Sequence, residues 1–244
     1  MWTRSELKTR AKEVLKKSYW KAFLVSLLIA FFSGEGNRSF NFNFGRSDFA
    51  RFGESSEFGG EILAIASVII IIMALGGIAF RVFLGYHLEV GGRRYFVRAA
   101  QDDENMDNVG YAFKNGRYMN IIKAMLYKGV LVFLWTLLLI IPGIVKSYAY
   151  RMVPYILTDN PHIGHKRAVE LSNEMTRGQK LDMFILDLSF LGWYILGVLA
   201  LVIGTLFVLP YDNSTKAQLY LVLRQEALDN GICSYEELMI DRVE

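Results

Sequence analysis

The chain has 244 residues, of which 53% are hydrophobic and only 21% are charged, and its mean hydropathy is +0.27. A soluble domain of this length would carry more charge, mixed more evenly along the chain. The net charge of +3 is too small to indicate a nucleic-acid partner. A single cysteine, Cys233, excludes an intramolecular disulfide and a cysteine-based metal site. We therefore expect an integral membrane protein.

The N-terminal residues 3–18 have the pattern of an amphipathic helix, which we place in the cytoplasm. Its apolar and basic positions fall on different faces, Leu7, Ala11, Val14 and Leu15 on one and Lys8, Lys12 and Lys16 on another. Such a helix can lie on an anionic membrane surface or pack on other cytoplasmic segments. We favour the membrane surface, because Tyr19 and Trp20 follow at the expected interface.

The first membrane span is predicted from Tyr19 to Ser33. The basic stretch before it is too long for a signal peptide, and no small-residue cleavage site follows, so we interpret this span as a retained anchor. Residues 34–60 are rich in Gly, Ser, Asn and Phe, which is typical of a loop. The second span begins at Ile62, includes 19 consecutive uncharged residues, and continues to about Tyr86.

Polar residues at 87–120 predict a cytoplasmic loop with an acidic patch. The third span is expected from Ile122 to Ile141, ending at a Pro-Gly pair. The fourth span, from Ile144 to Leu157, returns the chain to the cytoplasm and carries Lys146 and Arg151 on a polar face.

A second cytoplasmic segment, residues 159–181, contains a predicted soluble helix. Asn160 would cap this helix and Pro161 would take its first position, while Gly178 would end it. Its apolar stripe is Ala168, Leu171 and Met175. The fifth and sixth spans follow at about 182–198 and 204–223, and residues 224–244 form an acidic cytoplasmic tail.

The distribution of basic residues orients the spans. Lys and Arg number seven in residues 1–21, seven in 86–128 and four in 159–182, whereas the 34–61 segment has three against five acidic residues. The positive-inside rule places the first three segments in the cytoplasm. The prediction is thus an all-α, multi-pass transmembrane bundle of six helices in three hairpins, with its N-terminus inside. A weak repeat of Gly-containing pairs supports the hairpins. A five-helix bundle is the alternative.

Several charges fall within the predicted spans, where they cost free energy unless they are paired or hydrated. Helix geometry places Arg81, Arg151, Asp187 and Lys216 at similar depth, roughly 8–10 Å below the cytoplasmic interface. Asp212 and Lys216, four residues apart, share a helix face. These five residues could form a polar cavity that holds an anionic group such as a lipid phosphate. Alternatively, the charges pair and stabilise the bundle, or Arg81 and Lys216 reach the interface.

No signature of catalysis or of a cofactor is present. The sequence lacks a Walker loop, a His-Glu-x-x-His motif and a Gly-x-Ser-x-Gly motif. His162 and His165 have a spacing that can suit a metal, but no third ligand is evident. We therefore expect no enzymatic activity, no metal and no cofactor.

Six blocks of sequence resemble the domain of unknown function 975 family of bacterial integral membrane proteins, in the same order along nearly the whole chain. The blocks are RSELKTRAKEVLKKSYWKAFLVSLL, EVGGRRYFV, YRMVPYILTDNP, AVELSNEMTRGQK, LDLSFLGWYILG and LPYDNSTKAQLYLVL. The resemblance implies a location in the bacterial inner membrane and no known catalytic residues. The expected function is binding of lipid or a small amphiphile, or assistance to an envelope transport or stress system, with membrane lipids and a second membrane protein as partners. A small transporter, and a scaffold or immunity-type partner of another membrane protein, are the alternatives.

Overall fold

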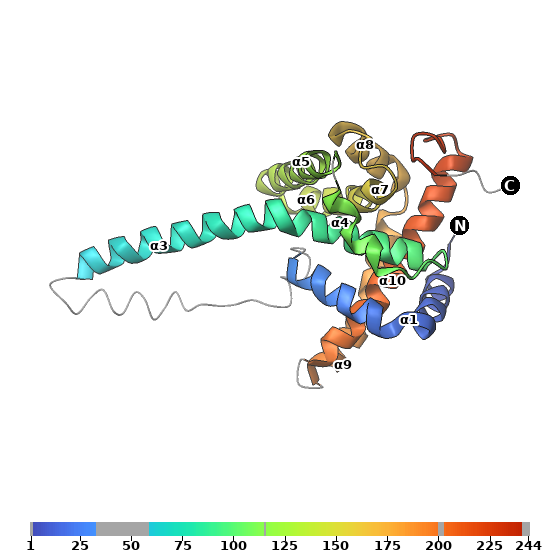
Figure 1. The fold of residues 1–244 in the computed structure, drawn as a ribbon, viewed down its shortest axis with the longest axis horizontal. Helices are drawn as coiled ribbons and strands as arrows, with labels where there is room; N and C mark the ends of the chain where they lie inside the picture. The colour runs from blue at the N-terminus through green and yellow to red at the C-terminus, as the bar shows by residue number, and fades with distance from the viewer. Residues whose placement is uncertain (1, 33–58, 115, 200–202, 241–244) are drawn as a thin grey trace.

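The computed structural model describes residues 2–32, 59–114, 116–199 and 203–240, and every regular element in these ranges is a helix (Figure 1). The elements are α1 (Arg4–Phe32), α3 (Gly59–Phe80), the π-helical η2 (Arg81–Gly85), α4 (Tyr86–Ala99), the 3-10 helix η3 (Met106–Phe113), α5 (Tyr118–Leu138), α6 (Ile140–Ala149), α7 (Val153–Asp159), α8 (His165–Met175), α9 (Lys180–Leu199) and α10 (Ile203–Asp229). The expected all-α class is confirmed. The predicted loop at 34–60 falls almost entirely outside the described residues.

Helix α1 joins the predicted amphipathic helix to the predicted first span through a kink. Ser18 has φ −143° and ψ 42°, at the boundary that the sequence indicates. The apolar stripe of the first half is buried, with Leu7 and Ala11 fully enclosed where α1 packs on α10. The expectation that this stripe lies on a membrane surface is wrong, because the protein itself covers it.

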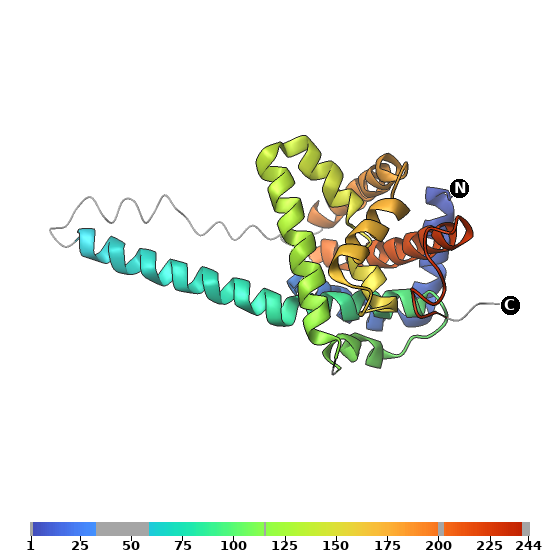
Figure 2. The ribbon, with the colours of Figure 1, turned by 90° about the horizontal axis from the view of Figure 1, so that it is seen from above.

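Helices α3, η2 and α4 follow one another without a break from Gly59 to Ala99 and differ sharply in burial (Figures 1 and 2). The described side chains of α3 are almost all exposed and apolar, and in both views α3 extends away from the other helices. Helix α4 is central, and Val90, Tyr95 and Phe96 are at most 1% exposed. The predicted cytoplasmic loop at 87–120 is therefore helical over much of its length and supplies part of the core.

The predicted fourth span, 144–157, is two short helices rather than one. Helix α5 ends where Leu139 is extended, and α6 turns back against it. The chain breaks again between Ala149 and Val153, and α7 is buried over all its residues. At this break the Ser172 hydroxyl donates to the Ala149 carbonyl at 2.8 Å and accepts from the Met152 amide at 3.1 Å. Ser172 of α8 thus supplies hydrogen bonds to the backbone groups of Ala149 and Met152 at the break.

Helix α8 begins later than predicted, at His165. The Asn160 side chain caps a turn instead, accepting from the His162 amide at 2.7 Å. Pro161 lies in that turn, and Gly164 takes φ +84° immediately before the helix. The predicted apolar stripe of Ala168, Leu171 and Met175 is buried, as expected.

The C-terminal residues fold onto the body. Helix α10 continues to Asp229, and beyond it Leu238 and Cys233 are 0% and 7% exposed. Arg167 of α8 forms a salt bridge with Glu237 at 2.6 Å, and this hydrogen bond raises the pKa of the Arg167 guanidinium. Burial raises the pKa of the Cys233 thiol to about 11. The predicted tail is therefore part of the packed structure up to about residue 240.

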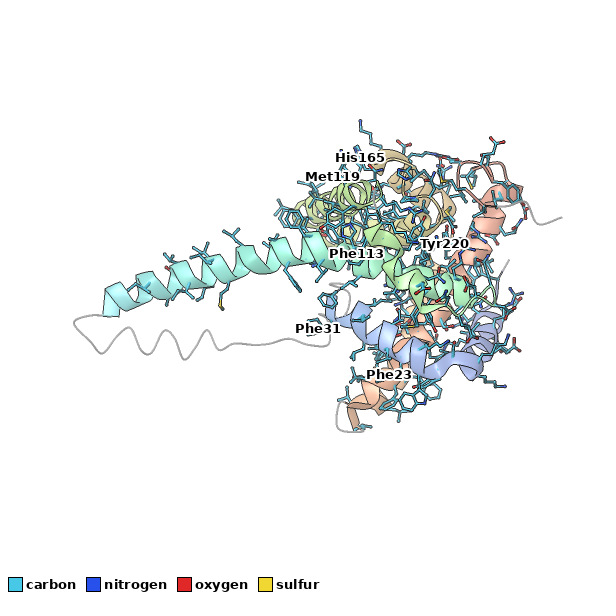
Figure 3. The ribbon with its side chains drawn as sticks, viewed as in Figure 1. Phe23, Phe31, Phe113, Met119, His165 and Tyr220 are labelled. Carbon is cyan, nitrogen blue, oxygen red and sulfur yellow. The ribbon has the colours of Figure 1, made fainter. Side chains whose placement is uncertain are left out.

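Exposed apolar side chains gather on the second half of α1, on α3, on the later turns of α5 and on α9. Representative exposed fractions are 80% for Phe31, 62% for Ile72, 73% for Leu137 and 76% for Leu199. In Figure 3, Phe31 lies at the end of α1 and Phe23 lies further back along it, whereas Tyr220 lies within the body. The molecule thus divides into an apolar-surfaced part and a body with a buried core, which we call the helical body (α4, α7, α8, and the packed parts of α1 and α10).

Candidate functional site

The structure brings together four of the five charged residues expected in a polar layer, as two ion pairs. Arg151, just after α6, contacts Asp187 of α9 at 2.7 Å. Lys216 contacts Asp212 at 2.9 Å along one face of α10. The pairs are largely buried, with side-chain exposures of 15% and 26% for the first and 14% and 12% for the second.

A tyrosine hydroxyl completes each pair. Tyr148 donates to the same Asp187 oxygen at 2.9 Å, and Tyr194 donates to Asp212 at 2.9 Å. The Arg151 guanidinium also lies 4.9 Å from the centre of the Tyr148 ring. Each carboxylate therefore accepts from one cation and one phenol on a single oxygen, an arrangement that lowers the cost of keeping it ionised away from water.

Arg81 does not join the layer. It lies in η2 and is exposed. Arg81 was grouped with the other charges because of its predicted depth along a span. Depth along a helix does not fix the direction in which a side chain points. The remaining four charges balance, so the expected excess of positive charge is absent from these two pairs. Their geometry fits the alternative interpretation, in which paired charges hold helices together.

A second polar network, which the sequence did not reveal, crosses the helical body around Arg93 of α4. Arg93 is 2% exposed and donates to the Tyr155 hydroxyl at 3.1 Å and to the Asn213 side-chain oxygen at 2.8 Å. Asn213 in turn donates to the Ser26 hydroxyl at 3.0 Å. This one chain of contacts joins α4, α7, α10 and α1.

The network continues through stacked rings to a third ion pair. Tyr155 stacks on Tyr220 with ring centres 5.3 Å apart. The Tyr220 hydroxyl donates to Asp159 at 2.6 Å, and Arg224 contacts the same carboxylate oxygen at 3.0 Å. Every residue of this network except Ser26 and Arg224 lies in the three blocks EVGGRRYFV, YRMVPYILTDNP and LPYDNSTKAQLYLVL. These blocks were therefore the sequence signal from which the network could have been found.

Arg94, beside Arg93, faces a different set of partners. It donates to the Thr158 carbonyl, and its guanidinium lies 3.5 Å from the centre of the Tyr111 ring. Arg117 lies 4.0 Å from the same ring centre. Arg93 and Arg94 thus both hold α4 against α7, and Arg94 also holds α4 against η3.

Two hollows lie away from these networks. One, of about 590 Å³, lies between the start of α1 and the start of α9. The other, of about 620 Å³, lies between α1, α10 and the residues just after α4. Neither is lined by the five residues expected to form a polar cavity.

Among the residues that the structure describes, three helical segments are long and apolar enough to cross a membrane, namely Ile65–Ala99, Tyr118–Leu138 and Lys180–Leu199. Residues 136–227 match the family described as "Protein of unknown function (DUF975)", which confirms the resemblance to the domain of unknown function 975 family over this stretch. The match runs from the end of α5 into α10 and leaves the two N-terminal sequence blocks outside it. No curated protein and no solved structure matches the chain.

Proposed function

We propose that this chain is a multi-pass integral membrane protein that binds lipid or a small amphiphile and has no enzymatic activity of its own. The observation that carries the proposal is the grouping of exposed apolar side chains on α1, α3, α5 and α9. Exposed apolar area on this scale is unfavourable in water and favourable against lipid tails. The buried ion pairs are already satisfied by protein groups, which gives no reason to assign them chemistry.

We further propose that the protein lies in a bacterial inner membrane with its N-terminus inside and six spans in three hairpins. The basic segments at 1–21, 86–128 and 159–182 support this orientation. The segment Ile65–Ala99 has 35 residues, about 52 Å of helix, which exceeds a hydrocarbon core of about 30 Å. We therefore assign α3 to the membrane and the buried, polar α4 to the cytoplasmic side.

Lipid retention tests the binding proposal. The full-length protein is extracted from its membrane in a mild detergent and purified, and the phospholipid that remains bound is quantified by mass spectrometry. We expect phospholipid in stoichiometric amounts after exhaustive detergent washing. Protein that retains no lipid while remaining folded contradicts the proposal.

A small transporter is the second candidate, and the break between α6 and α7 favours it. Interrupted helices that line a polar core are typical of transporters, and Tyr155 of α7 contacts the Arg93 network. Flux of a labelled solute into proteoliposomes would support this function. An assistant or scaffold role requires no flux.

A role as a scaffold or immunity-type partner of another membrane protein is the third candidate. The hollow between α1 and α10 favours it, because both charge signs line it, including Arg10, Glu13, Asp102 and Asp229. Co-purification of a stoichiometric membrane partner would distinguish this role from a lipid-binding protein that acts alone.

A further inference from the structure

The hollow between the starts of α1 and α9 combines cationic, hydroxyl and carboxylate groups. Arg4, Ser5 and Lys8 of α1 face Asp182 and Ser189 of α9 across about 590 Å³, and Trp2 lies at the edge before α1. Two segments far apart in sequence thus supply the lining. The Lys8 ammonium donates to the Ser189 carbonyl at 3.2 Å, which fixes its position against α9.

Positive charge is concentrated at this hollow. Burial and the neighbouring charges of Arg4 and Lys12 lower the pKa of Lys8, although Asp212 opposes the effect. Lys8 lies 4.4 Å from the centre of the Phe190 ring, and Lys12 lies 5.6 Å from that of Tyr211. A row of cations along α1 therefore faces an aromatic surface on α9 and α10, and Lys8 keeps N–H groups in addition to the one that Ser189 accepts.

The hollow lies beside the polar end of a membrane-spanning candidate. Leu181, Phe184 and Leu188 of α9 are apolar and exposed, at 68%, 46% and 52%. The Trp2 indole N–H is buried and has no hydrogen-bond partner among the described residues. Cations, a tryptophan and an adjoining apolar helix face are the combination found where membrane proteins meet lipid headgroups.

We propose that this hollow binds the headgroup of an anionic glycerophospholipid that carries hydroxyl groups, as phosphatidylglycerol does. Arg4 and Lys8 contact the phosphate, and Asp182 accepts a hydrogen bond from a headgroup hydroxyl. The acyl chains lie along the exposed face of α9. This inference rests on the proposed membrane location and names a ligand class and a site for the proposed lipid binding.

The test compares two double variants that each remove two positive charges from α1. Arg4→Gln with Lys8→Gln removes the cations of the hollow. Arg10→Gln with Lys17→Gln is the matched control, since these residues line the other hollow. Native mass spectrometry measures binding of phosphatidylglycerol, phosphatidylethanolamine and phosphatidylcholine to the full-length protein in detergent. We expect the wild type and the control to prefer phosphatidylglycerol, and the first variant to bind it about 30-fold more weakly.

The variant Arg4→Lys with Lys8→Arg preserves both charges and should keep the preference, which separates loss of charge from loss of fold. Equal weakening in the two Gln variants would overturn the site, as would unchanged binding in the first. Equal binding of phosphatidylethanolamine, or displacement of the lipid by inorganic phosphate at similar concentration, would overturn the choice of an anionic lipid. If the wild type retains no lipid, the proposed function itself fails. If the wild type retains lipid and the variant Arg4→Gln with Lys8→Gln binds it equally well, only this site is rejected.

Discussion

Arg151 and Asp187 form a residue pair that joins α9 to the break between α6 and α7. Charges in a membrane protein persist where a partner and further hydrogen bonds compensate for lost hydration. Here the partner is 2.7 Å away, and Tyr148 supplies a second donor at 2.9 Å. The pair therefore acts as a polar contact between α9 and the segment that follows α6.

Replacing Asp187 by Asn should lower the thermal unfolding midpoint of the detergent-solubilised protein, because it leaves Arg151 without its counter-charge. The cost should lie below the about 3–5 kcal/mol seen when fully buried pairs are broken in soluble proteins, since both side chains keep some exposure. Adding Arg151→Gln should recover part of the loss. Adding Arg81→Gln instead serves as the control and should recover none. Rescue by Arg81→Gln would show that the pairing is misassigned.

The role of a charged residue could be predicted from the sequence only where the segment that carries it was predicted to be a helix. Asp187 and Arg151 stood out because each interrupts an apolar run, and the cost of isolated charge there predicts a partner. Arg93 lies in the stretch 87–120, whose polar and mixed-charge composition predicted a loop, so its burial was missed. A charged composition does not exclude a buried helix whose charged side chains hydrogen-bond to neighbouring elements, as Arg93 does to Tyr155 and Asn213.

At the scale of elements, close approach to α4 explains the two glycines. A Cβ on Gly91 would lie 1.9 Å from the Val109 carbonyl oxygen, and a Cβ on Gly92 would lie 2.5 Å from the Ile29 side chain. The glycines thus allow η3 and α1 to pack directly on the α4 backbone. A stretch that was predicted to be a loop is therefore a packing surface in the fold.

Gly91→Ala should destabilise the protein by about 1–3 kcal/mol or more, the range for overpacking, because the atom it meets is backbone and cannot rotate away. Gly110→Ala in η3 is the control, since a Cβ there meets nothing within 4 Å. The midpoints of thermal unfolding of the Gly91→Ala and Gly110→Ala variants are compared. Equal midpoints for both variants would mean that η3 does not pack on α4 as described.

At the scale of the whole molecule, hydropathy predicted the helical class and the positions of α5, α9 and α10, since long apolar runs are the strongest sequence signal. It did not predict the break between α6 and α7, because the groups that satisfy that break, Ser172 and Thr176, lie on α8 and at its C-terminal cap. The tail was also missed, since its burial depends on contacts such as that of Glu237 with Arg167, 70 residues away.

The six-span arrangement predicts that the C-terminal segment faces the cytoplasm. Cys233 is a poor probe because it is buried, so we place the label at the exposed Glu236, as Glu236→Cys in a Cys233→Ala background. A membrane-impermeant thiol reagent should label this variant only after the cells are opened. Labelling in intact cells whose outer layers admit the reagent would favour five spans.

The central claim is that α3, α5 and α9 present their apolar side chains to lipid. Spin labels attached at Ile71, Leu137 and Leu196 in lipid nanodiscs test it most directly, with Glu170 on the helical body as the water-exposed reference. Relaxation by oxygen, which concentrates in the bilayer, is compared with relaxation by a water-soluble nickel chelate. We expect high oxygen and low nickel accessibility at the three apolar sites and the reverse at Glu170. Nickel accessibility at all three apolar sites equal to that at Glu170 would contradict a membrane location for these helices.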